Sequence, residues 1–145
     1  MSVLDAYAVI AFLRGEPAAV VVQPLLESGD ALLTAVGVAE VVDHLVRVIG
    51  VDEEEAVLDV AQLGLLEGFP VGAELGLAAG RLRARQYHRT RCSVSLADCV
   101  AAEVARSLGR PLVTSDPHLL DLCTREQVPH LALPGTDGTT WAPEH

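Results

Sequence analysis

The sequence predicts a single α/β domain, in which a mostly parallel sheet of about five strands is covered by helices on both faces. The chain has 145 residues, which is the usual size of one domain and long enough to bury a core. Half of its residues are hydrophobic. Short apolar runs typical of buried strands alternate along the chain with helical patterns, an order that favours a parallel sheet between two helical layers.

Local signals mark where these elements begin and end. Gly15 and Pro17 end the first helix and start the second. Asp52, with Glu55 three residues later, matches a capping box at the start of a further helix, and Gly109 closes another. In chain order, the predicted strands are 2–5, 30–36, 67–71, 110–116 and 128–134, and the predicted helices are 6–13, 17–28, 37–50, 51–66, 73–90, 93–109 and 117–123.

The strand at 67–71 is predicted to lie at an edge of the sheet, because Pro70 has no amide hydrogen for the ladder. We assign residues 1–134 to the domain. The Gly/Thr/Pro-containing segment 135–145 is expected to be a flexible C-terminal tail.

The charge of the chain restricts its partners and its chemistry. The formal net charge of −10 argues against nonspecific binding to nucleic acids or anionic membranes, and favours a basic protein partner or an acidic pocket that holds a cation. All ten positive residues are arginines. The absence of lysine excludes a Walker A phosphate loop and Schiff-base catalysis.

The cysteines and the N-terminus indicate a cytoplasmic protein. Cys92, Cys99 and Cys123 form no CxxC pair and are odd in number, as expected for reduced thiols. The first long apolar run, AYAVIAFL, follows no basic leader and is too short to span a bilayer. We therefore expect no membrane association.

Four acidic residues follow the predicted strands at the same edge of the sheet. Asp5 and Asp116 end two strands, whereas Glu40 and Asp98 lie in the first turns of helices that follow strand-like segments. Ligand sites of parallel sheets lie beyond the carboxyl ends of the strands. The four carboxylates are therefore expected to converge there.

Each acid also has a purely structural interpretation. Asp5 is placed to cap the helix that follows it, Asp116 precedes Pro117 as an N-cap would, and SLAD around Asp98 matches a capping box. Glu40 lies on a polar helical stripe, which is usually solvated.

Two observations favour a site. Asp98 lies beside small alanines, away from the exposed stripe of its helix, and all four acids fall at one edge of the sheet. Gathered carboxylates repel one another unless a cation is present. Mg²⁺ and Mn²⁺ prefer carboxylate and water oxygens, and such a site is suited to hydrolysis of phosphodiesters.

At these residues the sequence resembles the PIN-domain family, specifically VapC-like ribonuclease toxins of type II toxin–antitoxin pairs. The matching stretches are VLDAYAVIAFLRGEP, AVGVAEVVDHL, SLADCVAAEVARSLGRPLVTSD and the strand near HLAL. The resemblance implies a three-layer α/β/α sandwich and an endoribonuclease dependent on Mg²⁺ or Mn²⁺. It also implies a homodimer and a cognate antitoxin that blocks the site.

The resemblance also assigns roles to residues of this chain. Asp5 and Asp98 would be the direct metal ligands, and Glu40 and Asp116 would complete the catalytic cluster, directly or through water. Thr114 and Ser115 would support these ligands with their hydroxyl groups.

The segment RLRARQYHRTR holds five of the ten arginines. One hypothesis is that Arg81, Arg85 and Arg89 guide an RNA backbone toward the acidic edge, while Tyr87 stacks on a base. The alternative is a solvated helix face, or arginines paired with acids of a partner subunit. His44 and His88 are assigned no catalytic role.

Three other functions agree less well with the sequence. A phosphoacceptor receiver domain requires a lysine, and a haloacid-dehalogenase-like phosphatase requires a second aspartate where Tyr7 stands. The stronger alternative is a catalytically inactive PIN-like domain that binds RNA or a partner protein. The complete set of four acids argues against it, because a binding module has no need of a repulsive cluster.

Overall fold

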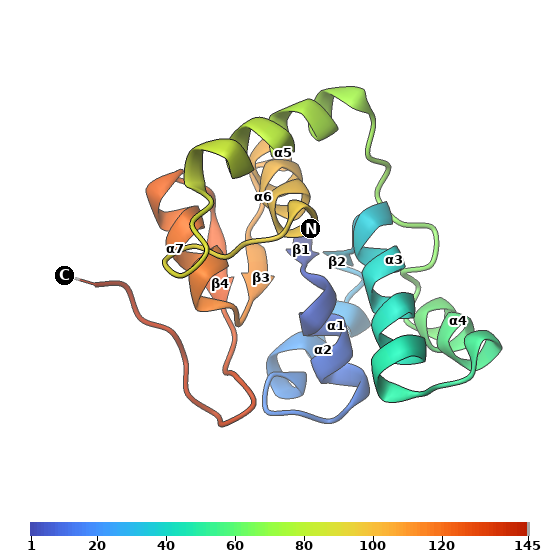
Figure 1. Ribbon diagram of the computed structural model, residues 1–145. Helices are drawn as coiled ribbons and strands as arrows, with labels where there is room; N and C mark the ends of the chain where they lie inside the picture. The colour runs from blue at the N-terminus through green and yellow to red at the C-terminus, as the bar shows by residue number, and fades with distance from the viewer. Residues whose placement is uncertain (145) are drawn as a thin grey trace.

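The structure, a computed structural model, describes residues 1–144 and contains one parallel sheet of four strands (Figure 1). The strands lie in the order β2-β1-β3-β4, and each neighbouring pair is parallel. Their bounds are β1 (Ser2–Leu4), β2 (Ala31–Leu32), β3 (Leu112–Thr114) and β4 (His130–Ala132). Val3 pairs with Leu32 on one side and Leu112 on the other, which places β1 at the centre of the sheet.

Helices connect the strands and cover both faces of the sheet (Figure 1). They are α1 (Ala6–Leu13), α2 (Ala19–Glu27), α3 (Ala35–Asp43), the π-helical η1 (His44–Ile49), α4 (Glu53–Gln62), α5 (Ala73–Gln86), α6 (Leu96–Leu108) and α7 (Pro117–Arg125). None of these helices, within residues 1–144, is long and apolar enough to cross a membrane.

Two hydrophobic cores form because successive strand residues point to opposite faces of the sheet. Val3 and Leu112 belong to the core shared with α5, α6 and α7. Leu4 and Val113 belong to the core shared with α1, α2 and α4. The predicted three-layer α/β/α architecture and its mostly parallel sheet are therefore confirmed.

The strand predicted at 30–36 is shorter in the structure because Thr34 starts the next helix. Its side-chain oxygen accepts a hydrogen bond from the Gly37 amide at 2.9 Å, so α3 begins at Ala35. The strand predicted at 67–71 is reduced to a single parallel bridge between Phe69 and Thr34. Pro70 cannot donate the next ladder hydrogen bond.

The helix predicted at 37–50 begins earlier and changes character at His44. The α-helical turns of α3 continue as η1, and Gly50, with a φ of 91°, caps the C-terminal end of η1. Such π-helical turns are rare and occur often at functional sites.

The helix predicted at 73–90 was too long, because α5 ends at Gln86. Tyr87 has extended backbone angles, and His88 pairs with Cys92 to close a tight turn. His88 Nδ1 accepts hydrogen bonds from the amides of Thr90 and Arg91, which stabilises this turn in place of another helical turn.

The segment after β4 folds back on the domain. The Gly135 amide donates to the Thr139 carbonyl, and the Trp141 indole donates to Asp121 of α7 at 2.9 Å. Trp141 also packs edge-on against His130. The boundary at residue 134 stays a prediction.

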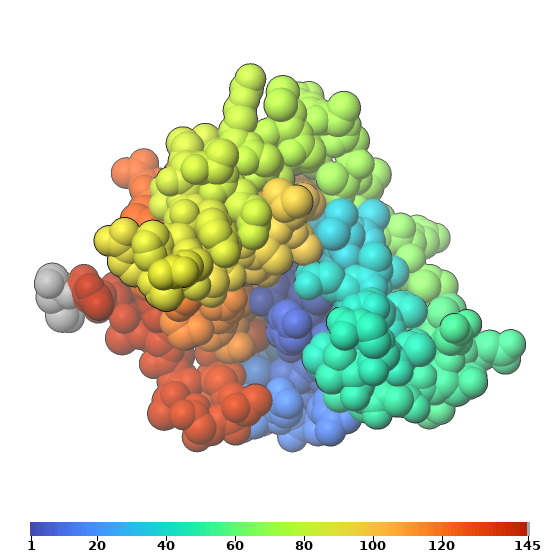
Figure 2. Space-filling model, in the orientation of Figure 1, coloured from blue at the N-terminus to red at the C-terminus, as the bar shows by residue number. Residues whose placement is uncertain are grey.

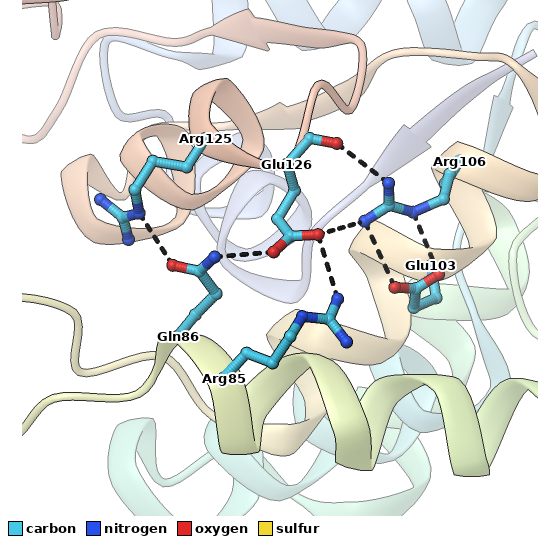
Figure 3. A network of polar contacts seen from close by, with 6 residues as sticks. All are labelled: Arg85, Gln86, Glu103, Arg106, Arg125 and Glu126. Atoms are coloured by element: carbon cyan, nitrogen blue, oxygen red, sulfur yellow. Dashed lines mark hydrogen bonds and ion pairs between the residues drawn. The ribbon is translucent and has the colours of Figure 1, made fainter.

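A network of polar contacts joins α5, α6 and α7 on the side of the sheet that carries these helices (Figure 3). Glu126 is its centre: its carboxylate accepts from Arg85 at 3.1 Å, Arg106 at 2.9 Å and Gln86 at 2.6 Å. Arg106 continues to Glu103, and Arg125 donates to Gln86. Partial burial opposes ionisation of Glu126, but these hydrogen bonds outweigh it, so its pKa lies below the usual value.

Replacement Glu126→Gln is expected to lower the free energy of unfolding by about 2 kcal/mol at pH 7, because two arginines lose a charged acceptor. A carboxylate with a lowered pKa stabilises the folded state above its unfolded pKa, and that stability is lost as the pH falls. The difference between variant and wild type should therefore shrink toward pH 4 in chemical denaturation.

The matched control for this prediction is Glu67→Gln, since Glu67 is exposed and makes no side-chain hydrogen bond within residues 1–144. Equal stability of the Glu126→Gln variant and wild type at pH 7 would show that the network does not hold these helices together.

Candidate active site

Asp5 connects the two central strands at their carboxyl ends. It follows β1, caps α1, and accepts a hydrogen bond from the Ala8 amide at 2.7 Å through Oδ1. Its Oδ2 accepts a hydrogen bond from the hydroxyl of Thr114, the last residue of β3. Asp5 is only 5% exposed, so the carboxylate is held from two sides inside the protein.

Asp98 and Asp116 are also helix-capping residues. Asp98 completes a capping box with Ser95: each residue's side chain accepts a hydrogen bond from the other's amide, at 2.9 and 3.0 Å. Asp116 caps α7 through Oδ1, which accepts from the His118 amide at 2.9 Å. The capping interpretation of all three aspartates is correct.

Capping leaves oxygen atoms of the cluster available. Within residues 1–144, Asp98 Oδ1, Asp116 Oδ2 and both carboxylate oxygens of Glu40 have no hydrogen-bond partner. No buried side-chain oxygen or nitrogen of this part of the chain lacks a partner, so these free oxygens face solvent. In Asp98 and Asp116, one oxygen can thus position the carboxylate while the other receives a ligand.

The acids lie close enough to influence one another electrostatically. Burial raises the pKa of Asp5 to about 7, against the effect of its hydrogen bonds from Thr114 and Ala8, and the charges of Asp98 and Asp116 raise it further. Burial and the charge of Asp98 raise the pKa of Glu40 to about 6. Burial and the charge of Asp116 raise the pKa of Asp98.

The donor set fits a hard divalent cation, because it consists of carboxylates, and three of them, Glu40, Asp98 and Asp116, have solvent-facing oxygens. No arginine is among the groups that shift these three pKa values. In residues 1–144, however, no group of three or more Asp, Glu, His or Cys side chains has the spacing of a metal site. The carboxylates would therefore have to move closer together around an ion.

The two hydroxyl residues differ in their surroundings. Thr114 is fully buried; its hydroxyl donates to Asp5 and accepts from the Asp116 amide at 3.1 Å. It therefore connects two of the acids directly. Ser115 is half-buried and lines a cavity beside Asp5 and Asp116.

This cavity, of about 350 Å³, is also lined by residues to which the sequence patterns assign no role in the site. Tyr7, Arg14 and His44 line it together with Asp5 and Asp116. The helical spacing of Tyr7 in α1 and Arg14 at its C-cap predicts that both lie on one face of this helix. No pattern in the sequence predicts that this face lies beside η1. A larger cavity of about 540 Å³ contains none of the four acids and is lined mainly by apolar residues.

Figure 2 shows the N-terminal segment recessed in a hollow of the surface, with residues 81–91 on the upper rim. Within that rim, Arg85 pairs with Glu126 of the same chain, and Arg83 donates to the Val94 carbonyl and lies over the ring of Tyr87. Arg81 and Arg89 are exposed and form no ion pair within residues 1–144.

Replacement Asp5→Asn is expected to stabilise the metal-free protein at pH 8. A folded pKa of about 7 lies above the unfolded value of 3.8, so ionisation of Asp5 destabilises the fold, and stability falls as the pH rises between these values. Asparagine keeps the cap without the charge. In EDTA at pH 8, we expect a melting temperature about 5 °C above wild type.

At pH 5 this difference should be much smaller, since Asp5 is then largely protonated in the folded state. The exposed replacement Glu55→Gln serves as the control. A variant that melts below wild type at pH 8 would contradict the conclusion that ionisation of the buried Asp5 destabilises the fold.

The geometry agrees with comparisons to known proteins. No curated protein sequence matches the chain significantly. The structure is similar to the crystal structure of FitAcB from Neisseria gonorrhoeae, with a TM-score of 0.63 and 20% sequence identity over 90% of this chain and 96% of that chain. This similarity concerns the fold. The family model for the PIN domain matches residues 2–124, so the chain belongs to the PIN-domain family.

Proposed function

We propose that this protein is an endoribonuclease that uses Mg²⁺ or Mn²⁺ to hydrolyse RNA phosphodiester bonds, and that it acts as the VapC-like toxin of a toxin–antitoxin pair. The observation that carries the proposal is the position of four carboxylates at the carboxyl edge of one parallel sheet. Burial and neighbouring acids raise the pKa values of Asp5, Glu40 and Asp98. Within residues 1–144, Glu40, Asp98 and Asp116 each keep a carboxylate oxygen without a hydrogen-bond partner. Membership of the PIN-domain family, whose members are generally nucleases, supports it.

The proposed role of each residue follows from its contacts in the site. Asp5 and Asp98 are proposed as direct ligands of the cation, with Glu40 and Asp116 completing the cluster. Thr114 orients Asp5 through its hydroxyl group, and Ser115 stands beside the site. When bound, the cation supplies positive charge beside the scissile phosphate and makes a water molecule more acidic.

A cation also resolves the electrostatic problem of the site. RNA phosphates are repelled by ionised carboxylates, and the chain carries a net charge of −10. Neutralising the cluster removes the local part of this repulsion. Arg81 and Arg89, which have no acidic partner among residues 1–144, are proposed to attract the RNA backbone at the rim, whereas Arg85 is already paired with Glu126.

The same charge supports a basic antitoxin as the protein partner, because a basic segment would complement the acidic edge. We propose that the toxin works as a homodimer in the cytoplasm, where its free, buried cysteines stay reduced.

Purified, antitoxin-free protein is expected to cleave RNA with Mn²⁺, and excess EDTA should abolish the cleavage. Asp5→Asn and Asp98→Asn should each reduce the rate at least about a hundredfold, because they remove proposed ligands. If the Asp5→Asn variant keeps its thermal stability, its loss of activity comes from the missing ligand and not from unfolding. Cleavage that survives in both variants would disprove the site assignment.

Millimolar Mn²⁺ should raise the melting temperature of wild type by about 5 °C, since an ion that binds only the folded state stabilises it. Asp98→Asn should lose most of this shift. No shift in wild type, together with no cleavage, would instead indicate the inactive PIN-like binding domain.

The double replacement Arg81→Gln/Arg89→Gln is expected to weaken RNA binding and to flatten its dependence on salt. Two lost phosphate contacts to a single strand should reduce the slope of log K against log salt by about 1.4. Arg110→Gln is the control, because Arg110 is exposed and precedes β3, at the opposite edge of the sheet. An unchanged slope would show that the segment does not contact RNA.

A further inference from the structure

The cavity beside the acids is large enough to hold a small organic molecule in addition to a cation. It has a volume of about 350 Å³, within the range of sites for small organic molecules. Its lining includes the acids Asp5 and Asp116 and the basic residue Arg14. The remaining walls come from His44 and Ile49 of η1 and from Pro134 and Thr136 in the segment after β4. It therefore extends from the acidic cluster along the outer side of α1.

One face of α1 forms the wall of this cavity. Tyr7, Ile10, Ala11 and Arg14 recur at the spacing of a helical stripe, and all four line the cavity. From Asp5 at the N-cap to Arg14 at the C-cap, the helix rises by about 14 Å. The wall thus has carboxylates at one end, an aromatic ring and apolar side chains next, and a guanidinium at the other end.

The aromatic part of the wall is exposed and supported. Tyr7 is 52% exposed, although it adjoins the buried Asp5. Its ring meets that of His44 edge-on, with the centroids 5.4 Å apart and the planes at 77°. This contact between α1 and η1 orients the tyrosine beside the acids. Exposed aromatic rings beside phosphate-binding sites are platforms on which nucleobases stack.

The basic part of the wall has no competing partner. Arg14 is exposed and makes no ion pair or side-chain hydrogen bond within residues 1–144. Among residues 1–144, Arg14 is the only arginine that lines this cavity. The lining also includes the acidic residue Glu16. The guanidinium is thus available to a phosphate at the end of α1 remote from the acids.

On the basis of the proposed nuclease function, we propose that this cavity receives one unstacked nucleotide next to the phosphate that is cut. The base lies against Tyr7 and His44, and the following phosphate binds Arg14. A paired and stacked base cannot enter such a cavity, so the nucleotide that the cavity receives must be unpaired. Tyr7, His44 and Arg14 are binding residues in this arrangement, not catalytic ones.

The test uses the full-length protein and a short single-stranded RNA with photoreactive 4-thiouridine placed at successive positions. Irradiation in EDTA, where no cleavage is expected, should attach one position of the RNA to the peptide that contains Tyr7 or His44. Mass spectrometry identifies the peptide. With Mn²⁺, Tyr7→Leu and Arg14→Gln should each raise KM about tenfold, with kcat within about twofold of wild type.

The matched controls are Leu108→Ala and Arg110→Gln, which alter an exposed apolar residue and an exposed arginine that precede β3, at the opposite edge of the sheet. They should leave the crosslink to Tyr7 or His44 unchanged. A double-stranded RNA of the same sequence should give neither the crosslink nor cleavage.

The outcomes separate this inference from the proposed function. Cleavage by wild type with KM and crosslink unaffected by Tyr7→Leu and Arg14→Gln would overturn the inference alone. A Tyr7 crosslink without cleavage of any RNA would support the inference and refute the nuclease. A crosslink confined to residues 81–91 would overturn the inference in favour of the arginine rim.

Discussion

The hydrogen bond from Thr114 to Asp5 is the contact on which the geometry of the acidic edge depends. It joins the ends of the two central strands, and the same two side chains also bind the amides of Ala8 and Asp116. The start of α1 and the start of α7 are thereby fixed relative to each other. Asp5 and Asp116, which lie at these two starts, can approach the same point only because of this arrangement.

Helix capping and ligand binding are compatible in this site because they use different oxygen atoms. Asp98 and Asp116 each hold a helix end with one oxygen and leave the other free. The cap is a stabilising contribution that exists whether or not a cation is present. It offsets part of the repulsion and desolvation that raise the pKa values of the cluster. The residue pattern alone cannot separate the two roles, because both require a carboxylate at a helix N-terminus.

The ten arginines of this acidic protein serve different purposes. Arg85, Arg106 and Arg125 belong to the network around Glu126 and Gln86, which holds α5, α6 and α7 together (Figure 3). Arg81 and Arg89 remain exposed on the rim, and Arg14 lines the cavity along α1. A count of positive charges in one segment therefore overstates its capacity to bind RNA. Under the proposed function, the arginines that form no ion pair within residues 1–144 are the ones available to RNA.

The order of the elements and the parallel sheet were predictable from the sequence, whereas the roles of the four acids stay a prediction. Alternating strand and helix patterns depend on local periodicity, and the edge at which parallel strands end follows from their direction. Element ends were less predictable. Thr34 shortened a strand by capping α3, and the side chain of His88 stabilised a turn where the helix was expected to continue. Both effects come from single side-chain hydrogen bonds that compete with the backbone ladder.

The sequence by itself determined the alternation of strands and helices and the edge of the sheet at which Asp5 and Asp116 lie. Only the tertiary structure decided that Thr114 binds Asp5, that Arg85 is engaged with Glu126, and that Tyr7 meets His44 beside the acids. These contacts join residues that are 109, 41 and 37 positions apart, as their numbers show. Local patterns carry no information on such pairs, because they arise when separate helices pack against the same sheet.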